Sequence, residues 1–84
     1  MWDETSAKRL GNTLGALRKA RGLSQESLAY QAGITKNQLQ LIEAGRSTGR
    51  ADSAGPSNPR MSTLAGVAEV LGTSVAELLE SARI

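Results

Sequence analysis

Apolar side chains recur every three or four residues in five segments of this chain, a spacing that predicts helices with one buried face. The first segment covers about residues 6–20 and places leucines at 10, 14 and 17 on one face. Four more helices are expected, at about 25–32, 36–44, 61–71 and from 75 onward. The inward residues of the first three of these are Leu28, Ala29, Ala32, Leu39, Ile42, Leu64, Val67, Ala68 and Leu71, and the last helix carries Val75, Leu78 and Leu79. No strand pattern is present, so we expect an all-α fold of five helices.

Polar caps and glycines mark the ends of these helices. Ser24 and Thr35 can each accept a hydrogen bond from the first unpaired N–H groups of a helix. Ser74 and Glu77 have the spacing of a capping box before the fifth helix. Glycine tolerates the left-handed backbone that commonly ends a helix, and it follows the first four helices at Gly22, Gly33, Gly45 and Gly72.

The longest break in the pattern is residues 46–60, RSTGRADSAGPSNPR, between the third and fourth helices. A connection of this length without apolar periodicity is long for a compact domain, and such connections are usually functional or mobile. The remaining connections are short. The 84 residues therefore form one domain, residues 1–84, in which 46–60 is an extended loop.

The composition excludes several kinds of site. The chain has no cysteine and no histidine, which removes thiolate and imidazole ligands and the commonest nucleophile–base pairs. Glu77 and Glu80 lie one helical turn apart, a pattern typical of a solvated helix face. We expect no enzyme activity, no metal and no cofactor.

Charge is distributed unevenly. Residues 8–60 carry nine basic residues against three acidic ones, a net charge of +6, whereas residues 61–84 carry three glutamates and one arginine. Such a basic segment is the pattern of a surface that binds a polyanion. No apolar run is long enough to span a membrane and the N-terminus lacks a signal-peptide core, so a cytoplasmic protein is expected.

Residues 25–44, QESLAYQAGITKNQLQLIEA, join the second and third predicted helices through a short turn. Counted from Gln25, the fourth, fifth, ninth, tenth, fifteenth and eighteenth positions are Leu28, Ala29, Gly33, Ile34, Leu39 and Ile42. This order of aliphatic, small and glycine residues resembles the helix-turn-helix of the lambda repressor/Cro class, the xenobiotic-response-element family of bacterial and phage regulators. The resemblance extends to LGNTLGALRKARGLSQ before the motif, and to IEAGRS and NPRMSTLAGVAEVLGTSVAELL after it.

The resemblance implies a lambda-repressor-like fold whose third helix enters the major groove of double-stranded DNA. Amide side chains can pair with adenine and lysine with guanine, so the implied base-reading residues are Lys36, Asn37, Gln38 and Gln40. Leu41 departs from the family, which usually has a polar or basic residue there. A leucine can contact a thymine methyl group, or it can be an ordinary exposed apolar residue.

Contacts with the DNA backbone are expected from residues around the motif. A helix N-terminus attracts phosphate through its free N–H groups and partial positive charge, which favours Gln25 and Thr35. Arginines of the 46–60 loop can reach further phosphates. The predicted phosphate-contacting residues are Gln25, Thr35, Arg46, Arg50 and Arg60, and the loop is expected to be poorly ordered without DNA.

Two further expectations follow from the family. A helix-one arginine commonly pairs with the glutamate before the glycine turn, which here predicts an ion pair between Arg18 and Glu43. Regulators of this kind act as dimers on pseudo-palindromic operators, since a two-fold dimer doubles the base contacts. The predicted dimer interface is the apolar surface of the fifth helix and the residues after it: Val75, Leu78, Leu79 and Ile84.

Two functions remain open because helix-turn-helix domains serve more than one. The first is sequence-specific DNA binding by a transcriptional regulator with no separate ligand domain. The alternative is an antitoxin-type or protein-bridging module whose main partner is another protein. A bridging module has no need of a base-reading face, so the polar third helix and the basic segment favour DNA.

Overall fold

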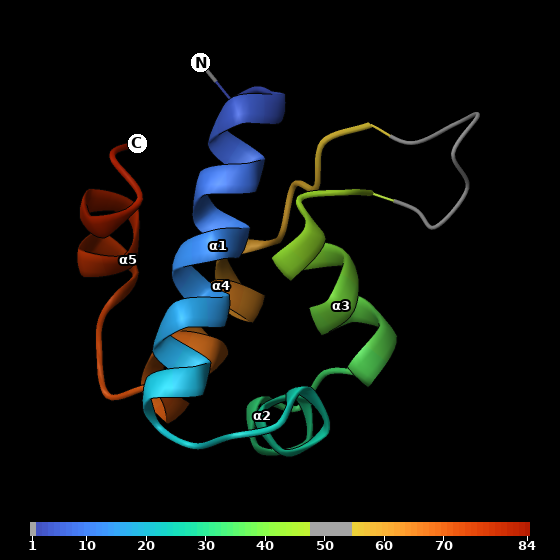
Figure 1. The fold of residues 1–84 in the computed structure, drawn as a ribbon, viewed down its shortest axis with the longest axis vertical. Helices are drawn as coiled ribbons and strands as arrows, with labels where there is room; N and C mark the ends of the chain where they lie inside the picture. The colour runs from blue at the N-terminus through green and yellow to red at the C-terminus, as the bar shows by residue number, and fades with distance from the viewer. Residues whose placement is uncertain (1, 48–54) are drawn as a thin grey trace.

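The computed structural model describes residues 2–47 and 55–84, and this part of the chain is all-α, as predicted. Five helices follow one another: α1 (Glu4–Ala20), α2 (Gln25–Ala32), α3 (Lys36–Ala44), α4 (Met61–Val70) and α5 (Val75–Ser81). In Figure 1, α1 runs through the centre, with α5 on one side and α3 on the other. Helix α4 lies behind α1, and α2 crosses the lower end of the molecule.

The helix ends follow the predicted caps with two differences. Ser24 and Thr35 cap α2 and α3, and Gly22, Gly33, Gly45 and Gly72 all have positive φ angles. Helix α1 begins earlier than expected because the Asp3 carboxylate accepts a hydrogen bond from Ser6 N–H at 2.8 Å. This hydrogen bond lowers the pKa of Asp3. At α5, the Glu77 carboxylate accepts a hydrogen bond from the Ser74 hydroxyl. In a capping box this carboxylate would instead accept from the backbone N–H of Ser74, and that bond is not observed among the described residues.

One apolar core is shared by all five helices. It contains most of the predicted inward residues, among them Leu10 and Leu14 of α1, while Leu17, Ala32 and Val75 are only partly buried around it. Helix α2 packs against α3 and α4, and α1 packs against α3 and α5. No single helix of the described part is both long and apolar enough to cross a membrane. Helices α4 and α5 meet that length and composition only when taken together, and they are bent by 89° relative to each other. The apolar residues of this pair fill the core.

Helix α5 contradicts one assignment made from the sequence. Leu78, predicted to lie in a dimer interface, is 1% exposed and belongs to the core. The reason is the length of the chain: a domain of this size has little apolar material, and the inward stripe of its last helix is needed to close the core against α1 and α4.

The two ends of the 46–60 loop are held in place, contrary to the expectation for those residues. Arg46 pairs with Pro56 in an antiparallel bridge. Ser47 N–H donates to Gly55 C=O at 2.9 Å, and Ser57 N–H donates to Gly45 C=O at 3.1 Å. We call residues 45–47 and 55–57 the loop base. Residues 48–54, including Arg50, lie outside the described part of the chain.

Close approach of α1 to α3 depends on a glycine. A Cβ atom built on Gly11 would lie 2.5 Å from the carbonyl oxygens of both Ile42 and Glu43. Those oxygens belong to the last turn of α3 and cannot move without moving the helix. Gly15, one turn later, would place a Cβ 3.3 Å from a carboxylate oxygen of Glu43, a side-chain atom that can shift more easily.

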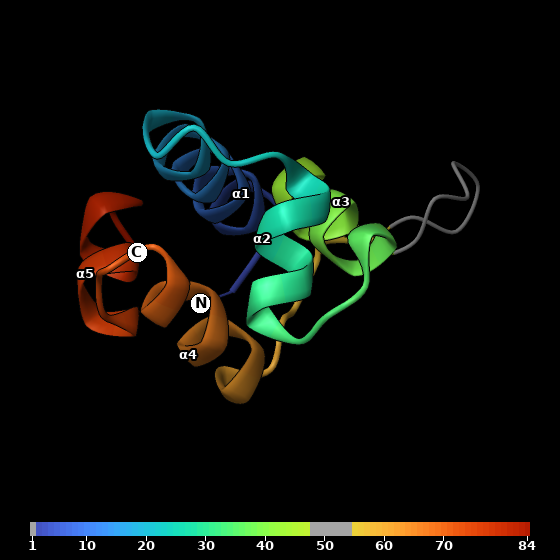
Figure 2. The ribbon, with the colours of Figure 1, turned by 90° about the horizontal axis from the view of Figure 1, so that it is seen from below.

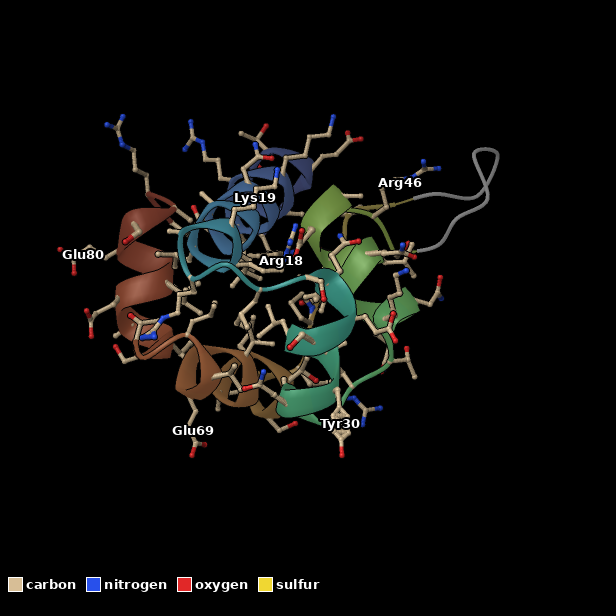
Figure 3. All side chains as sticks on the ribbon, turned by 60° about the horizontal axis from the view of Figure 1, so that its bottom comes forward. Arg18, Lys19, Tyr30, Arg46, Glu69 and Glu80 are labelled. Carbon is tan, nitrogen blue, oxygen red and sulfur yellow. The ribbon has the colours of Figure 1, made fainter. Side chains whose placement is uncertain are left out.

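A buried ion pair joins the same two helices. The Arg18 guanidinium donates to Glu43 through Nε at 2.8 Å and through Nη2 at 3.0 Å, and its Nη1 donates to Leu23 C=O at 2.9 Å. The side chains are 11% and 10% exposed. The pair expected from the sequence is therefore present in a bidentate, nearly buried form. Figure 3 shows Arg18 turned inward and Lys19 turned outward.

We predict that Gly11→Ala lowers the free energy of unfolding. Overpacking typically costs about 1–3 kcal/mol, which outweighs the gain of about 1 kcal/mol in helix propensity. Gly15→Ala is the matched control, with the same gain in propensity and a softer contact, and should be close to neutral. Urea denaturation followed by circular dichroism measures both, and equal stability of the two variants would contradict the packing argument.

We also predict that Arg18→Met destabilises the domain by about 3 kcal/mol, because an unpaired carboxylate is left in a nearly buried position. The Glu43 carboxylate, by accepting hydrogen bonds, raises the pKa of Arg18. Because the pKa of Arg18 is higher in the folded than in the unfolded state, protonation of Arg18 stabilises the fold. This stabilisation is complete below the ordinary pKa of arginine and is lost only as pH rises through the raised pKa, so Arg18 stays charged in any ordinary buffer. The double variant Arg18→Met/Glu43→Leu should recover most of the loss; a double variant as unstable as the sum of both singles would contradict a buried pair.

Candidate nucleic-acid interface

Helix α3 presents its polar side chains to solvent. Lys36, Asn37, Gln38 and Gln40 are all exposed, whereas Leu39 and Ile42 are buried against α1 and α2. At 100° per residue, Asn37 lies almost opposite the buried stripe, with Gln40 beside it. Lys36, Asn37 and Gln40 therefore share one outward surface, while Gln38 and the half-buried Leu41 lie toward the connection to α4. Figure 2 shows α3 at the side of the molecule, next to α2.

A capping box fixes the N-terminus of α3. The Thr35 hydroxyl accepts from Gln38 N–H at 3.0 Å, and the Gln38 amide oxygen accepts from Thr35 N–H at 2.8 Å. Both residues were predicted to contact DNA, and both have a structural function as well. The Gln38 amide nitrogen and the Thr35 hydroxyl proton remain donors to another acceptor. The spacing and residue types of Thr35 and Gln38 do not distinguish a capping function from a DNA contact. Because capping uses only the side-chain oxygens of both residues as acceptors, it would not prevent their remaining donors from contacting DNA.

Gln25, at the first turn of α2, is tied to the buried ion pair. Its amide nitrogen donates to Glu43 Oε1 at 3.1 Å, and the residue is half-buried. One of the two amide protons is thus used within the molecule and the other is left for a phosphate. This bond also sets the position of the α2 N-terminus relative to the end of α3.

The C-terminal half of α3 faces a hollow of about 550 Å³. Leu41 lines it and is half-buried, so the leucine that departs from the family pattern is partly covered by the connection to α4. Gln38, Arg46 and Arg60 line the same hollow. Arg60 is the exposed N-cap of α4, and Arg46 is half-buried in the loop base. Two of the three loop arginines predicted to grip phosphate therefore flank α3, as Figure 3 shows for Arg46.

The predicted dimer surface is smaller than expected. With Leu78 in the core, the apolar residues that remain at the surface are Ile84, which is 46% exposed, and the half-buried Val75 and Leu79. Within residues 2–47 and 55–84, no group of three or more carboxylates is placed to hold a metal ion.

Two aromatic residues have positions that the sequence analysis did not assign. Tyr30 projects from α2 and is 80% exposed (Figure 3). Trp2 packs partly against the core, and its indole N–H donates to Ser57 C=O at 2.6 Å. A contact between residues 55 positions apart leaves no local pattern from which it could have been predicted.

Comparison with known proteins agrees with this architecture. A family model described as a helix-turn-helix domain matches residues 9–80. An uncharacterized HTH-type transcriptional regulator, y4dJ of Sinorhizobium fredii, is 32% identical over 72 residues, which are 86% of this chain and 80% of that protein.

Solved structures show the same arrangement of helices. The clp gene regulator ClgR of Corynebacterium glutamicum superposes with a TM-score of 0.76 at 26% identity, over 93% of this chain and 72% of that one. SinR, a master regulator for biofilm formation solved in complex with DNA, superposes with a TM-score of 0.66 at 34% identity, over 83% of this chain and 97% of that one. By the family match, the sequence similarity and the shared fold, the chain belongs to the helix-turn-helix transcriptional regulators of the lambda repressor/Cro type.

Proposed function

We propose that this protein binds double-stranded DNA sequence-specifically by inserting α3 into the major groove. The observation that carries the proposal is the outward face of α3, where Lys36, Asn37 and Gln40 are exposed on a helix that the Arg18–Glu43 pair anchors from behind. Sequence information in DNA is available only to groups that reach base edges or sense DNA shape. A rigid helix with exposed donors and acceptors meets the first requirement.

Within this surface, the proposed functions of the residues differ. Asn37 is the principal base-reading residue, with Lys36 and Gln40 beside it, because an amide can pair in bidentate fashion with adenine and lysine can donate to guanine. Gln38 and Leu41 lie at the edge of the same surface, toward the hollow. Gln25, Thr35, Arg46 and Arg60 surround the helix and contact phosphates; we extend this assignment to Arg50 from its charge and place in the sequence.

The protein acts, in this proposal, as a homodimer on a pseudo-palindromic operator in the cytoplasm. One α3 covers only a few base pairs, and a two-fold dimer would place two recognition helices about one turn of DNA apart. Ile84, Leu79 and Val75 are the apolar residues of the C-terminal region that are at least partly exposed.

A protein partner is the competing proposal, and the known structures leave room for it. SinR has been solved with DNA and also as a complex with SinI, the latter superposing with a TM-score of 0.68 at 32% identity over 84% of this chain and 60% of that one. The polar face of α3 favours DNA here. A gel shift with random-pool DNA at several salt concentrations tests the choice: binding that weakens with salt supports DNA, and absence of any shift at low salt would contradict it.

We predict that Asn37→Ala lowers affinity for the best DNA site by about 1–3 kcal/mol and relaxes the base preference at one or two positions in each half-site. Arg46→Ala should weaken good and poor sites equally and reduce the log–log salt slope by about 0.9, since phosphates carry no sequence information. Gln31→Ala, an exposed amide on α2, is the control and should change neither. Equal weakening of matched and mutated sites by Asn37→Ala would show that this residue does not read bases.

Dimerisation gives a separate prediction. Ile84→Glu should shift the protein toward monomer in sedimentation at micromolar concentration without unfolding it, because the side chain is exposed in the single chain. Met61→Glu replaces another exposed apolar residue, on α4, and should leave the oligomeric state unchanged. A wild-type monomer both with and without DNA would rule out the proposed interface.

A further inference from the structure

Ser57 is the point at which the connection between α3 and α4 is anchored. It is 4% exposed, although it belongs to a stretch that the sequence predicts to be a solvated loop. Its N–H donates to Gly45 C=O at 3.1 Å, which ties it to the end of α3. Its own C=O accepts from the Trp2 indole at 2.6 Å. The residue is therefore held by its backbone from two sides, by α3 and by the segment that precedes α1.

Both described loop arginines lie close to this anchor along the chain. Arg46 follows Gly45 directly and is bridged to Pro56, the neighbour of Ser57. Arg60 lies three residues after Ser57, at the N-cap of α4. Without the Trp2 bond, the Ser57 carbonyl would be a buried acceptor lacking a donor, and such a group is costly to leave unpaired. The segment would be expected to move toward water and to carry both arginines with it.

We propose that Trp2 is a positioning residue for DNA binding: its indole N–H holds Ser57 so that Arg46 and Arg60 flank α3 and grip the DNA backbone together. The inference rests on the proposed function, since it assigns these arginines to phosphates. Trp2 touches no DNA in this account. It acts through the loop base, and it links the segment before α1 to the affinity of the binding surface.

Trp2→Phe removes the donor and retains an aromatic side chain against the core. We expect roughly tenfold weaker DNA binding, the effect of losing about one charge-assisted contact, with the base preference unchanged. The log–log salt slope should become shallower by about 0.9, the change expected for the loss of one phosphate contact. A loss of fold stability alone would not change the salt slope of the protein that remains folded.

Two controls isolate the indole bond. Ser57→Ala keeps the accepting carbonyl and removes a buried hydroxyl that has no hydrogen-bond partner among residues 2–47 and 55–84, so affinity and slope should match the wild type. In an Arg46→Ala/Arg60→Ala background, Trp2→Phe should cause no further change in the salt slope, because the effects of substitutions at residues that act through one another are not additive. An additional loss of slope in that background would overturn the proposal.

Nuclear magnetic resonance of the wild type provides a test that does not require the variant to fold. The chain has one tryptophan, so a single indole N–H signal reports on the Ser57 bond. The indole N–H should be protected from exchange with solvent in the free protein and should stay protected when DNA is bound, because the bond to Ser57 is formed before DNA binds. If the indole N–H of the folded protein exchanges freely with solvent, or if Trp2→Phe binds with the wild-type slope, the inference about Trp2 is wrong. If the wild type binds no DNA at all, the proposed function fails instead.

Discussion

The position of α3, the proposed recognition helix, depends on one nearly buried carboxylate. Glu43, near the end of α3, accepts hydrogen bonds from Arg18 of α1 and Gln25 of α2, and Arg18 also donates to Leu23 C=O in the turn between those helices. Three helices and a turn are thus joined by charged or polar groups with strict geometry. Buried ion pairs contribute little net stability but are costly to break. The pair therefore acts mainly to select one arrangement of α3, and Gly11 allows that arrangement by letting α1 approach the backbone of α3.

The anchored helix explains how so small a domain can present a defined surface. An exposed amide specifies a base only if its backbone is held within a fraction of an ångström of the correct place. Here the capping box of Thr35 and Gln38 fixes the start of α3, while Glu43 fixes its end. The side chains of Glu43 and Gln38 are hydrogen-bonded within the molecule, and Asn37 and Gln40 are exposed on the outer side of α3. Asn37 and Gln40, which we propose to read bases, are therefore not the residues that anchor the helix.

Features set by residues close together in the sequence were predicted better than contacts between residues far apart in the sequence. The caps at Ser24 and Thr35, the glycine stops and most helix bounds follow from rules that act within four or five residues, and the structure reproduces them. The start of α1 is the exception, because the cap at Asp3 was not predicted. The Arg18–Glu43 pair followed from family resemblance rather than from spacing. Leu78 was misplaced because an amphipathic stripe does not say whether its apolar face meets the same chain or another. The Trp2–Ser57 and Gln25–Glu43 bonds were missed because a polar side chain has several possible partners and only the folded backbone selects among them.

The central claim is that α3 lies in the major groove of a specific DNA site. Chemical protection of a site selected from a random DNA pool tests it directly, because guanine N7 is exposed in the major groove and adenine N3 in the minor groove. We expect the bound protein to protect guanine N7 in two patches about one helical turn apart on one face of the duplex, with adenine N3 left reactive between them. Bound DNA whose guanine N7 atoms all remain reactive, or whose protection is confined to adenine N3, would contradict the account.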